Sequence, residues 1–131
     1  MSDLGGGPVE LGEVAAAADL APTRLALVNA LTAVERNNVN DILTVLSELE
    51  TNALHHAGGA TGVRAHLLDD MLRLEVDDAS ARMPVLRASA GASGGFGLRI
   101  IDQLAVRWGY TRSGDGKTVW AILPCPSVTP I

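Results

Sequence analysis

Several features that mark specialised classes of protein are missing from this 131-residue sequence. It has one cysteine, Cys125, so no internal disulfide can form, as is usual in a reducing compartment. There is no run of about 18 apolar residues, which a membrane-spanning helix would need. The N-terminus also lacks the basic and apolar segments of a signal peptide. We therefore expect a cytoplasmic protein.

Positive charge is scarce as well. Ten Lys and Arg residues against fifteen Asp and Glu residues give a net charge of −5, and no Lys/Arg-rich cluster occurs. Nucleic acid and anionic membranes are therefore not expected as partners. Apolar residues make up 47% of the chain and charged residues 19%, so a folded domain with a sizeable core is expected.

The chain divides into three expected parts: an N-terminal arm (1–20), one domain (21–124) and a tail (125–131). The arm is rich in Gly and Ala, so we expect it to be flexible and to end, at most, in a short strand or helical turn. Cys125 lies in the tail, where the sequence gives it no evident role.

Within the domain, apolar periodicity predicts three helices, over residues 23–36, 42–57 and 98–105. The second helix would have Asp41 as its N-cap and would stop at Gly58. Alternating apolar and polar residues predict two hairpins, with strands 62–68 and 71–77, then 106–112 and 117–123. This order indicates an α+β fold, a two-layer α/β sandwich whose mixed, mostly antiparallel sheet has helices on one face.

A polar stripe runs along the second helix, in the segment "LSELETNALHHA". Glu48, Asn52 and His56 are spaced i, i+4 and i+8 along one flank of its apolar face. The amide oxygen of Asn52 suits a hard cation such as Mg²⁺, and Glu48, about 6 Å away along the helix, could accept a proton. Two alternatives stay open: a half-exposed flank with i,i+4 contacts, or a metal site built from Glu48 and His56.

A second candidate residue ends the strand "LRLEVDD". Asp78 continues the alternation of Leu72, Leu74 and Val76, so its carboxylate is expected to face the core. A buried carboxylate needs a donor, and the exocyclic amine of a purine would serve. The alternative is that Asp78 forms a turn at the start of the following loop.

Glycines mark a third candidate region, in "GASGGFGLRI". Gly94, Gly95 and Gly97 precede the predicted helix 98–105, and glycines at a helix N-terminus allow close approach of phosphates. Taken alone this is a weak signal, because Gly-rich loops are common. The later "GDGKT" is not a phosphate-binding P-loop, since the first Gly of that motif is missing and a strand follows where a helix is needed.

Together these segments resemble the GHKL ATPase superfamily (the Bergerat ATP-binding fold) over about residues 24–123. They are most similar to its small single-domain branch, which includes anti-sigma-factor serine kinases. "SELETNALHHA" resembles the N-box, "VDDAS" with "MPVLR" the first glycine box, "GGFGLRIID" the second glycine box, and "GKTVWAIL" the closing strand. Four such motifs in the right order carry the resemblance.

The resemblance implies a role for each matching residue. Glu48 would be the general base, Asn52 would bind the Mg²⁺ that bridges the ATP phosphates, and Asp78 would accept a hydrogen bond from the adenine amine. Thr118 would support the adenine through its hydroxyl or a water, a role that rests on the resemblance alone. The ATP lid and its phosphate contacts would fall to three glycines, Gly94, Gly95 and Gly97.

The function that the resemblance implies is an ATP- and Mg²⁺-dependent protein serine/threonine kinase and regulator. Its partner would be a sigma factor or an antagonist of anti-sigma factors. Relatives in this branch often form homodimers, so a homodimer is also possible. Phe96 stands where many relatives carry a lid Arg, and Glu50 stands where an aliphatic residue is usual. These departures keep two alternatives open: a nucleotide-sensing interaction module without effective kinase activity, and a regulator that binds no nucleotide.

Overall fold

The computed structural model describes residues 7–82 and 95–128, with side chains from residue 98 onward in the second range. The elements in chain order are β1 (Val9–Val14), the short 3-10 helix η2 (Ala17–Asp19), α1 (Leu20–Ala33), α2 (Val39–Ala57), β2 (Ala60–Leu68), β3 (Met71–Asp78), α3 (Gly95–Leu104), β4 (Arg107–Ser113) and β5 (Gly116–Pro124). No helix within these described ranges is both long and apolar enough to cross a membrane.

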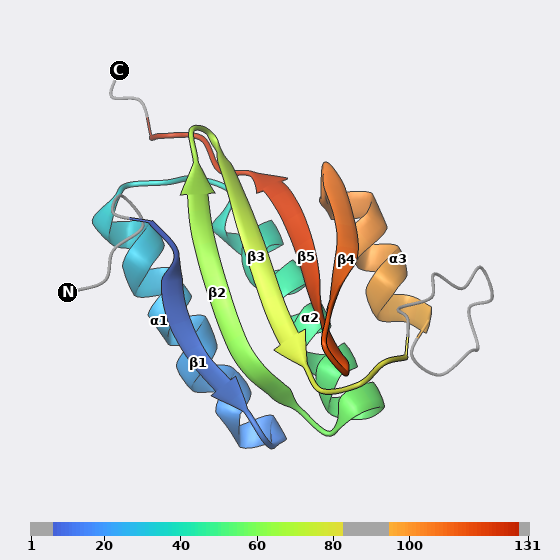
Figure 1. Cartoon of the computed structure of the whole chain (residues 1–131). Helices are drawn as coiled ribbons and strands as arrows, with labels where there is room; N and C mark the ends of the chain where they lie inside the picture. The colour runs from blue at the N-terminus through green and yellow to red at the C-terminus, as the bar shows by residue number, and fades with distance from the viewer. Residues whose placement is uncertain (1–6, 83–94, 129–131) are drawn as a thin grey trace.

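Five strands form one sheet in the order β1-β2-β3-β5-β4, and all neighbouring pairs are antiparallel. The three α-helices lie together on one face of this sheet, with α2 between α1 and α3 (Figure 1). The expected α+β two-layer sandwich is confirmed. The sheet, expected to be mixed, has no parallel pair among the described strands.

The core lies between the helices and the inner face of the sheet. Ile42, Leu46 and Leu49 of α2 are fully or almost fully buried, as their helical spacing predicts. On β3 the buried and half-buried residues alternate strictly, so Leu72 and Leu74 face the helices. Burying such side chains stabilises the fold by about 1.5–3 kcal/mol each.

The second helix ends where two glycines were expected to stop it. Gly58 caps α2 in the left-handed conformation, with φ of 76°. Gly59 has φ of 143°, and its N–H donates to the Ala53 carbonyl oxygen at 3.0 Å. A Cβ atom on Gly59 would overlap the carbonyl oxygen of Val14, so β1 and α2 can approach this closely only because residue 59 has no side chain.

Parts of the expected N-terminal arm and C-terminal tail pack against the sheet. Within the expected arm, residues 9–14 form edge strand β1, whose Val9, Leu11 and Val14 are buried. In the expected tail, Cys125 is fully buried, and its N–H donates to the Asp70 carbonyl oxygen at 2.7 Å. Packing against the sheet thus orders segments whose composition favours flexibility.

Three helix starts also differ from prediction. α1 begins at Leu20 and ends at Ala33, about three residues earlier than expected at each end. α2 begins at Val39 after Asn38, whose φ is 70°, so the N-cap prediction for Asp41 is wrong. α3 begins at Gly95, which places two of the glycines expected before the helix inside its first turn.

Candidate functional site

The two flanks of α2 have different neighbours. On one flank, Thr23 and Arg24 of α1 contact Glu50 and Ser47: Thr23 Oγ1 donates to Glu50 Oε2 at 2.6 Å, and Arg24 Nη1 donates to Ser47 Oγ at 2.5 Å. Glu48 and Asn52 lie on the opposite flank at about 100° per residue. Since α3 packs on the side of α2 away from α1 (Figure 1), the polar stripe faces the space beside α3.

Glu48 and Asn52 are half-buried. Within the described ranges, neither side chain forms a hydrogen bond or ion pair, so both keep open oxygen atoms. Such oxygens suit a hard cation that retains waters and phosphate ligands. The described residues contain no cluster of three acidic, His or Cys side chains that would cage a metal alone. Asn52 could therefore supply one oxygen ligand to a Mg²⁺ ion whose other ligands are phosphate oxygens and waters.

Asp78 is 6% exposed and faces the helix layer, as the alternation of β3 predicted. Its partner in the structure is Lys117, which lies opposite it on β5 and is also 6% exposed. Lys117 Nζ donates to Asp78 Oδ1 at 3.0 Å, and the Ser80 N–H donates to the same oxygen at 2.9 Å. The turn role that was left open for Asp78 is thus present alongside its inward direction.

Thr118 lies on the other face of the sheet. It pairs in register with Asp77, and its hydroxyl donates to Asp77 Oδ1 at 2.6 Å. One residue along a strand reverses the direction of the side chain, so Thr118 and Asp78 point to opposite faces. The structure therefore does not bring Thr118 and Asp78 together, and it pairs Asp78 with Lys117 instead.

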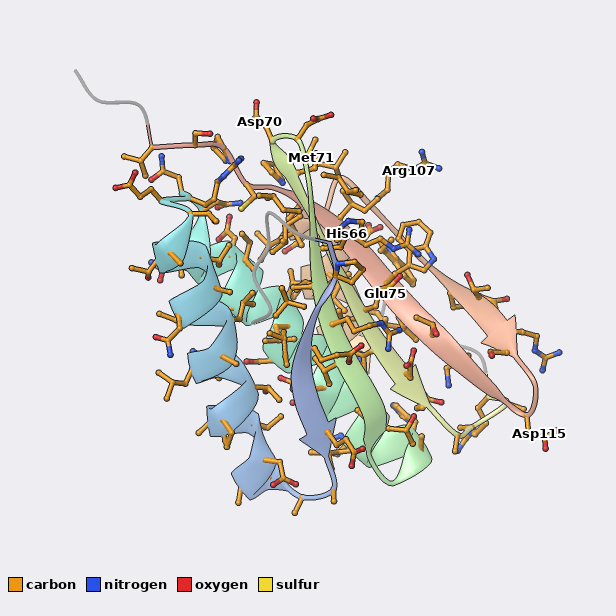
Figure 2. The ribbon with its side chains drawn as sticks, turned by 60° about the vertical axis from the view of Figure 1, so that its left-hand side comes forward. His66, Asp70, Met71, Glu75, Arg107 and Asp115 are labelled. Carbon is orange, nitrogen blue, oxygen red and sulfur yellow. The ribbon has the colours of Figure 1, made fainter. Side chains whose placement is uncertain are left out.

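The outer face carries its own ionic network. Arg64 donates to Asp77 through both terminal nitrogens, at 2.6 and 2.8 Å, and to Glu75 at 3.0 Å. These bonds from Arg64 hold the pKa of Asp77 below its usual value. Glu75 lies on the face turned away from the helices (Figure 2), where the guanidinium of Arg73 stacks 4.6 Å from the centre of the Trp120 ring. This network is separate from the inward-facing site.

Several elements that carry the candidate residues have an end at the same side of the molecule. The C-terminal ends of α2 and β3 and the N-terminal ends of α3 and β5 lie together there (Figure 1). Figure 2 shows the turn at Asp115 at this end, with the turn at Asp70 at the opposite end of the sheet. Gly95 and Gly97 belong to the first turn of α3 at this end. Gly94 lies outside the described residues.

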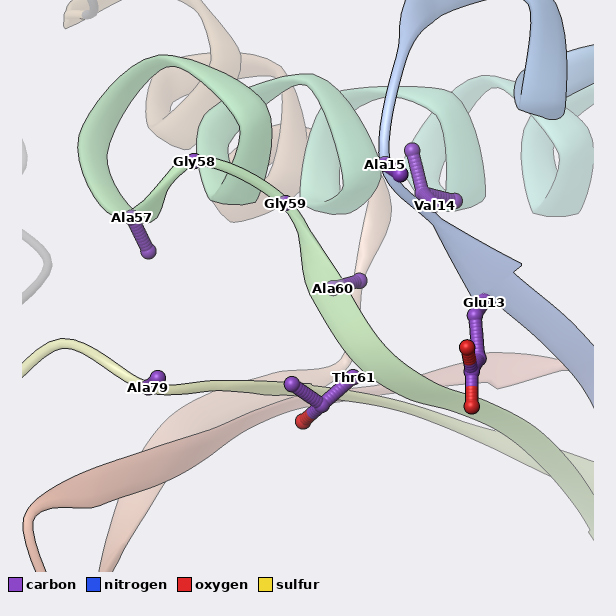
Figure 3. Close-up of a pocket in the computed structure, with 9 residues that line it drawn as sticks. All are labelled: Glu13, Val14, Ala15, Ala57, Gly58, Gly59, Ala60, Thr61 and Ala79. Carbon is purple, nitrogen blue, oxygen red and sulfur yellow. The ribbon is translucent and has the colours of Figure 1, made fainter.

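A shallow hollow of about 260 Å³ opens at the same end, on the β1 side of β3 (Figure 3). It is lined by the end of β1, the Ala57–Ala60 segment that links α2 to β2, Thr61 and Ala79. Ala79 follows Asp78 directly in the chain, but Asp78 itself does not line the hollow. None of the residues predicted for the site lines it.

Glu50 of α2 is, with Asp78 of β3, one of two buried carboxyl groups among the described residues. Its side chain is fully buried, and Oε1 has no hydrogen-bond partner among the described residues. Burial raises the pKa of Glu50 to about 7, although the Thr23 hydroxyl and the nearby Arg24 charge act in the opposite direction. Because Glu50 lies on the α1 flank, it is not part of the Glu48–Asn52 stripe.

Sequence reasoning missed Lys117, which was read only as the start of the last strand. A signal was available: Lys117 shares the inward alternation of Val119, Ala121 and Leu123. The same parity argument that found Asp78 on β3 would have identified Lys117 on β5.

Comparison with models of protein families matches residues 14–123 to the histidine kinase-like ATPase domain. The match spans β1's last residue through β5 and so includes Glu48, Asn52, Asp78 and Lys117. No curated protein matches the chain.

Proposed function

The chain belongs to the histidine kinase-like ATPase domain family, and we propose that it is an ATP- and Mg²⁺-binding regulator that phosphorylates a serine or threonine of a protein partner. The partner class would be a sigma factor or an antagonist of anti-sigma factors, as in the small single-domain branch that the motifs resemble. Action in the cytoplasm is part of this proposal.

One observation carries the proposal. Asp78, a buried acceptor, ends β3 at the end of the molecule where α2 also ends, and Glu48 at the middle of α2 and Asn52 in its C-terminal half lie on one helix flank with open oxygens. The exocyclic amine of a purine would donate a hydrogen bond to the Asp78 carboxylate. The phosphates of the nucleotide would extend toward the α2 flank and the first turn of α3, where free helix N–H groups favour anions.

The chemical step follows from the residues on α2. Glu48 would accept the proton of the partner's hydroxyl, whose oxygen would form a bond to the γ-phosphorus. The bond from that phosphorus to the β–γ bridging oxygen would break, and ADP would leave. Asn52 would hold Mg²⁺, which would neutralise charge on the phosphates.

Calorimetric titration of ATP, with and without Mg²⁺, tests the binding half of the proposal. Asp78→Asn should weaken ATP binding by at least about tenfold, because it loses a charge-assisted hydrogen bond. Asp77→Asn is the matched control, since this neighbouring carboxylate faces away from the site. Asn52→Ala should remove the Mg²⁺ dependence. If wild type binds no ATP, the proposal fails.

Transfer from γ-labelled ATP to a candidate antagonist protein tests the kinase half. We expect label on serine or threonine with wild type and none with Glu48→Gln. Glu10→Gln, which removes an exposed carboxylate on β1, should transfer label as wild type does. Equal transfer by wild type and Glu48→Gln would show that Glu48 is not the base.

A second candidate function is a nucleotide-sensing interaction module without effective phosphoryl transfer. Phe96 favours it, because this position in the first turn of α3 carries no cation to meet phosphate charge. This candidate predicts ATP binding that depends on Asp78 and Asn52, with no label transferred to any protein offered.

A further inference from the structure

Lys117 is the only lysine in the sequence, and its side chain is 5% exposed. A lysine is rarely buried unless its ammonium is paired, because desolvating the charge is costly. Here the ammonium donates to Asp78 Oδ1 at 3.0 Å and to the Ser80 carbonyl oxygen at 3.3 Å. The side chain therefore reaches the one inward-facing carboxylate at the end of β3.

Both members of this pair keep bonding capacity. An ammonium has three N–H donors, and the described residues supply acceptors for two of them. The Asp78 carboxylate takes both of its described hydrogen bonds on Oδ1, which leaves Oδ2 without a donor from the described residues. The pair thus offers one acceptor and one donor side by side, held on two hydrogen-bonded central strands.

We propose that Asp78 and Lys117 together recognise the Watson–Crick edge of adenine, an inference that rests on the proposed function. Asp78 accepts a hydrogen bond from the amine at C6, and Lys117 donates to the ring nitrogen N1. Lys117, and not Thr118, is the β5 residue that contacts the base. The pair presents an acceptor next to a donor, the same pattern with which uracil pairs to adenine.

This arrangement also predicts a preference among purines. Guanine carries a carbonyl at C6 and an N–H at position 1, the reverse of adenine at both atoms. A guanine placed in the same position would set its N–H against the ammonium and its carbonyl against the carboxylate. A buried donor that faces a donor, or an acceptor that faces an acceptor, forms no hydrogen bond, so GTP should bind more weakly than ATP.

The test pairs a protein variant with an altered nucleotide. In 1-deaza-ATP a C–H group replaces N1, so the base keeps its amine and loses only the acceptor for Lys117. Wild type should bind ATP about 10- to 100-fold more tightly than 1-deaza-ATP, the range for a hydrogen bond to a charged donor. Lys117→Met should bind the two nucleotides equally. Arg107→Met, which alters an exposed cation at the other end of β4, should keep the wild-type preference.

Three outcomes would overturn the inference while leaving ATP binding intact. Equal binding of ATP and 1-deaza-ATP by wild type would remove Lys117 from the base contact. Tighter ATP binding by Lys117→Met would show that the lysine blocks the site. A variant that kept the preference would place N1 against another donor. Failure of wild type to bind ATP at all would instead reject the proposed function.

A measurement on wild type alone covers the case in which Lys117→Met does not fold. Lysine labelled with 15N at Nζ gives one side-chain signal, because the sequence has a single lysine. ATP should shift this signal, and saturating 1-deaza-ATP should shift it by less than half as much. Identical shifts with the two nucleotides would overturn the inference.

Discussion

Replacing Glu50 by glutamine should remove a pH dependence from the stability of this protein. Glu50 is fully buried between α1 and α2, and burial raises its pKa from 4.5 to about 7. The unfolded chain exposes the same carboxyl to water, where its pKa is close to 4.5. Glutamine keeps the shape and the acceptor for the Thr23 hydroxyl but cannot ionise.

The sign and the size follow from proton linkage. Below pH 4.5 both states hold the proton, so Glu50 adds no pH dependence. Between pH 4.5 and about 7 the folded state holds a proton that the unfolded state releases, so the free energy of unfolding falls as the pH rises. The difference of about 2.5 units corresponds to a loss of about 3 kcal/mol, which is complete above pH 7.

Urea denaturation of wild type and Glu50→Gln from pH 4 to pH 9 measures this effect. The variant should match wild type near pH 4 and exceed it by about 3 kcal/mol at pH 8 and above. Glu10→Gln removes an exposed carboxylate and should follow wild type throughout. A difference between wild type and Glu50→Gln that stays constant with pH would refute the reasoning, because it would mean that Glu50 titrates alike in both states.

Three further predictions use the same denaturation assay. Arg64→Met should lower the free energy of unfolding by about 1–2 kcal/mol at pH 7. Because Arg64 lowers the pKa of Asp77, this loss of stability should shrink as the pH falls below 3.8. A loss that stayed constant with pH would contradict the prediction. Gly59→Ala should lower the free energy of unfolding by at least about 2 kcal/mol, because its Cβ atom would overlap the backbone of β1. The Cβ atom of Gly58→Ala meets no atom within 4 Å, so this variant should lose only about 1 kcal/mol, for its left-handed conformation. Equal losses would reject the overlap. Cys125→Ser should cost about 1–3 kcal/mol by burying a hydroxyl, and no change would show that residue 125 lies outside the core.

The sequence predicted those helices and strands in which apolar residues recur regularly along one face. The apolar arc of α2, from Ile42 to Ala53, has the period of a helix, and the alternation of β3 placed Asp78 inward. The bounds of β1 were not predicted, because its alternation fails after Leu11. The pairing of β1 with β2 is irregular on both sides of Gly12, which leaves an exposed pair before the buried Val14.

The site could be predicted only where one segment carried it. Glu48 and Asn52 are neighbours on a single helix, so spacing alone placed them on one flank. The pairing of Asp78 with Lys117 depends on the register between β3 and β5, which are separated along the chain by α3 and β4. Our proposal puts Lys117 in place of Thr118 as the residue that contacts the base; the two are one residue apart, and in a strand that displacement reverses the face.

The register of β3 against β5 runs without a break from Met71 opposite Pro124 to Asp78 opposite Lys117. Asp78 lies at the end of β3 and Lys117 near the start of β5, so the pairing of these two neighbouring strands brings the acid and the lysine together. The distance between the Asp78 and Lys117 side chains is thus fixed by the pairing of two strands and not by a single local segment.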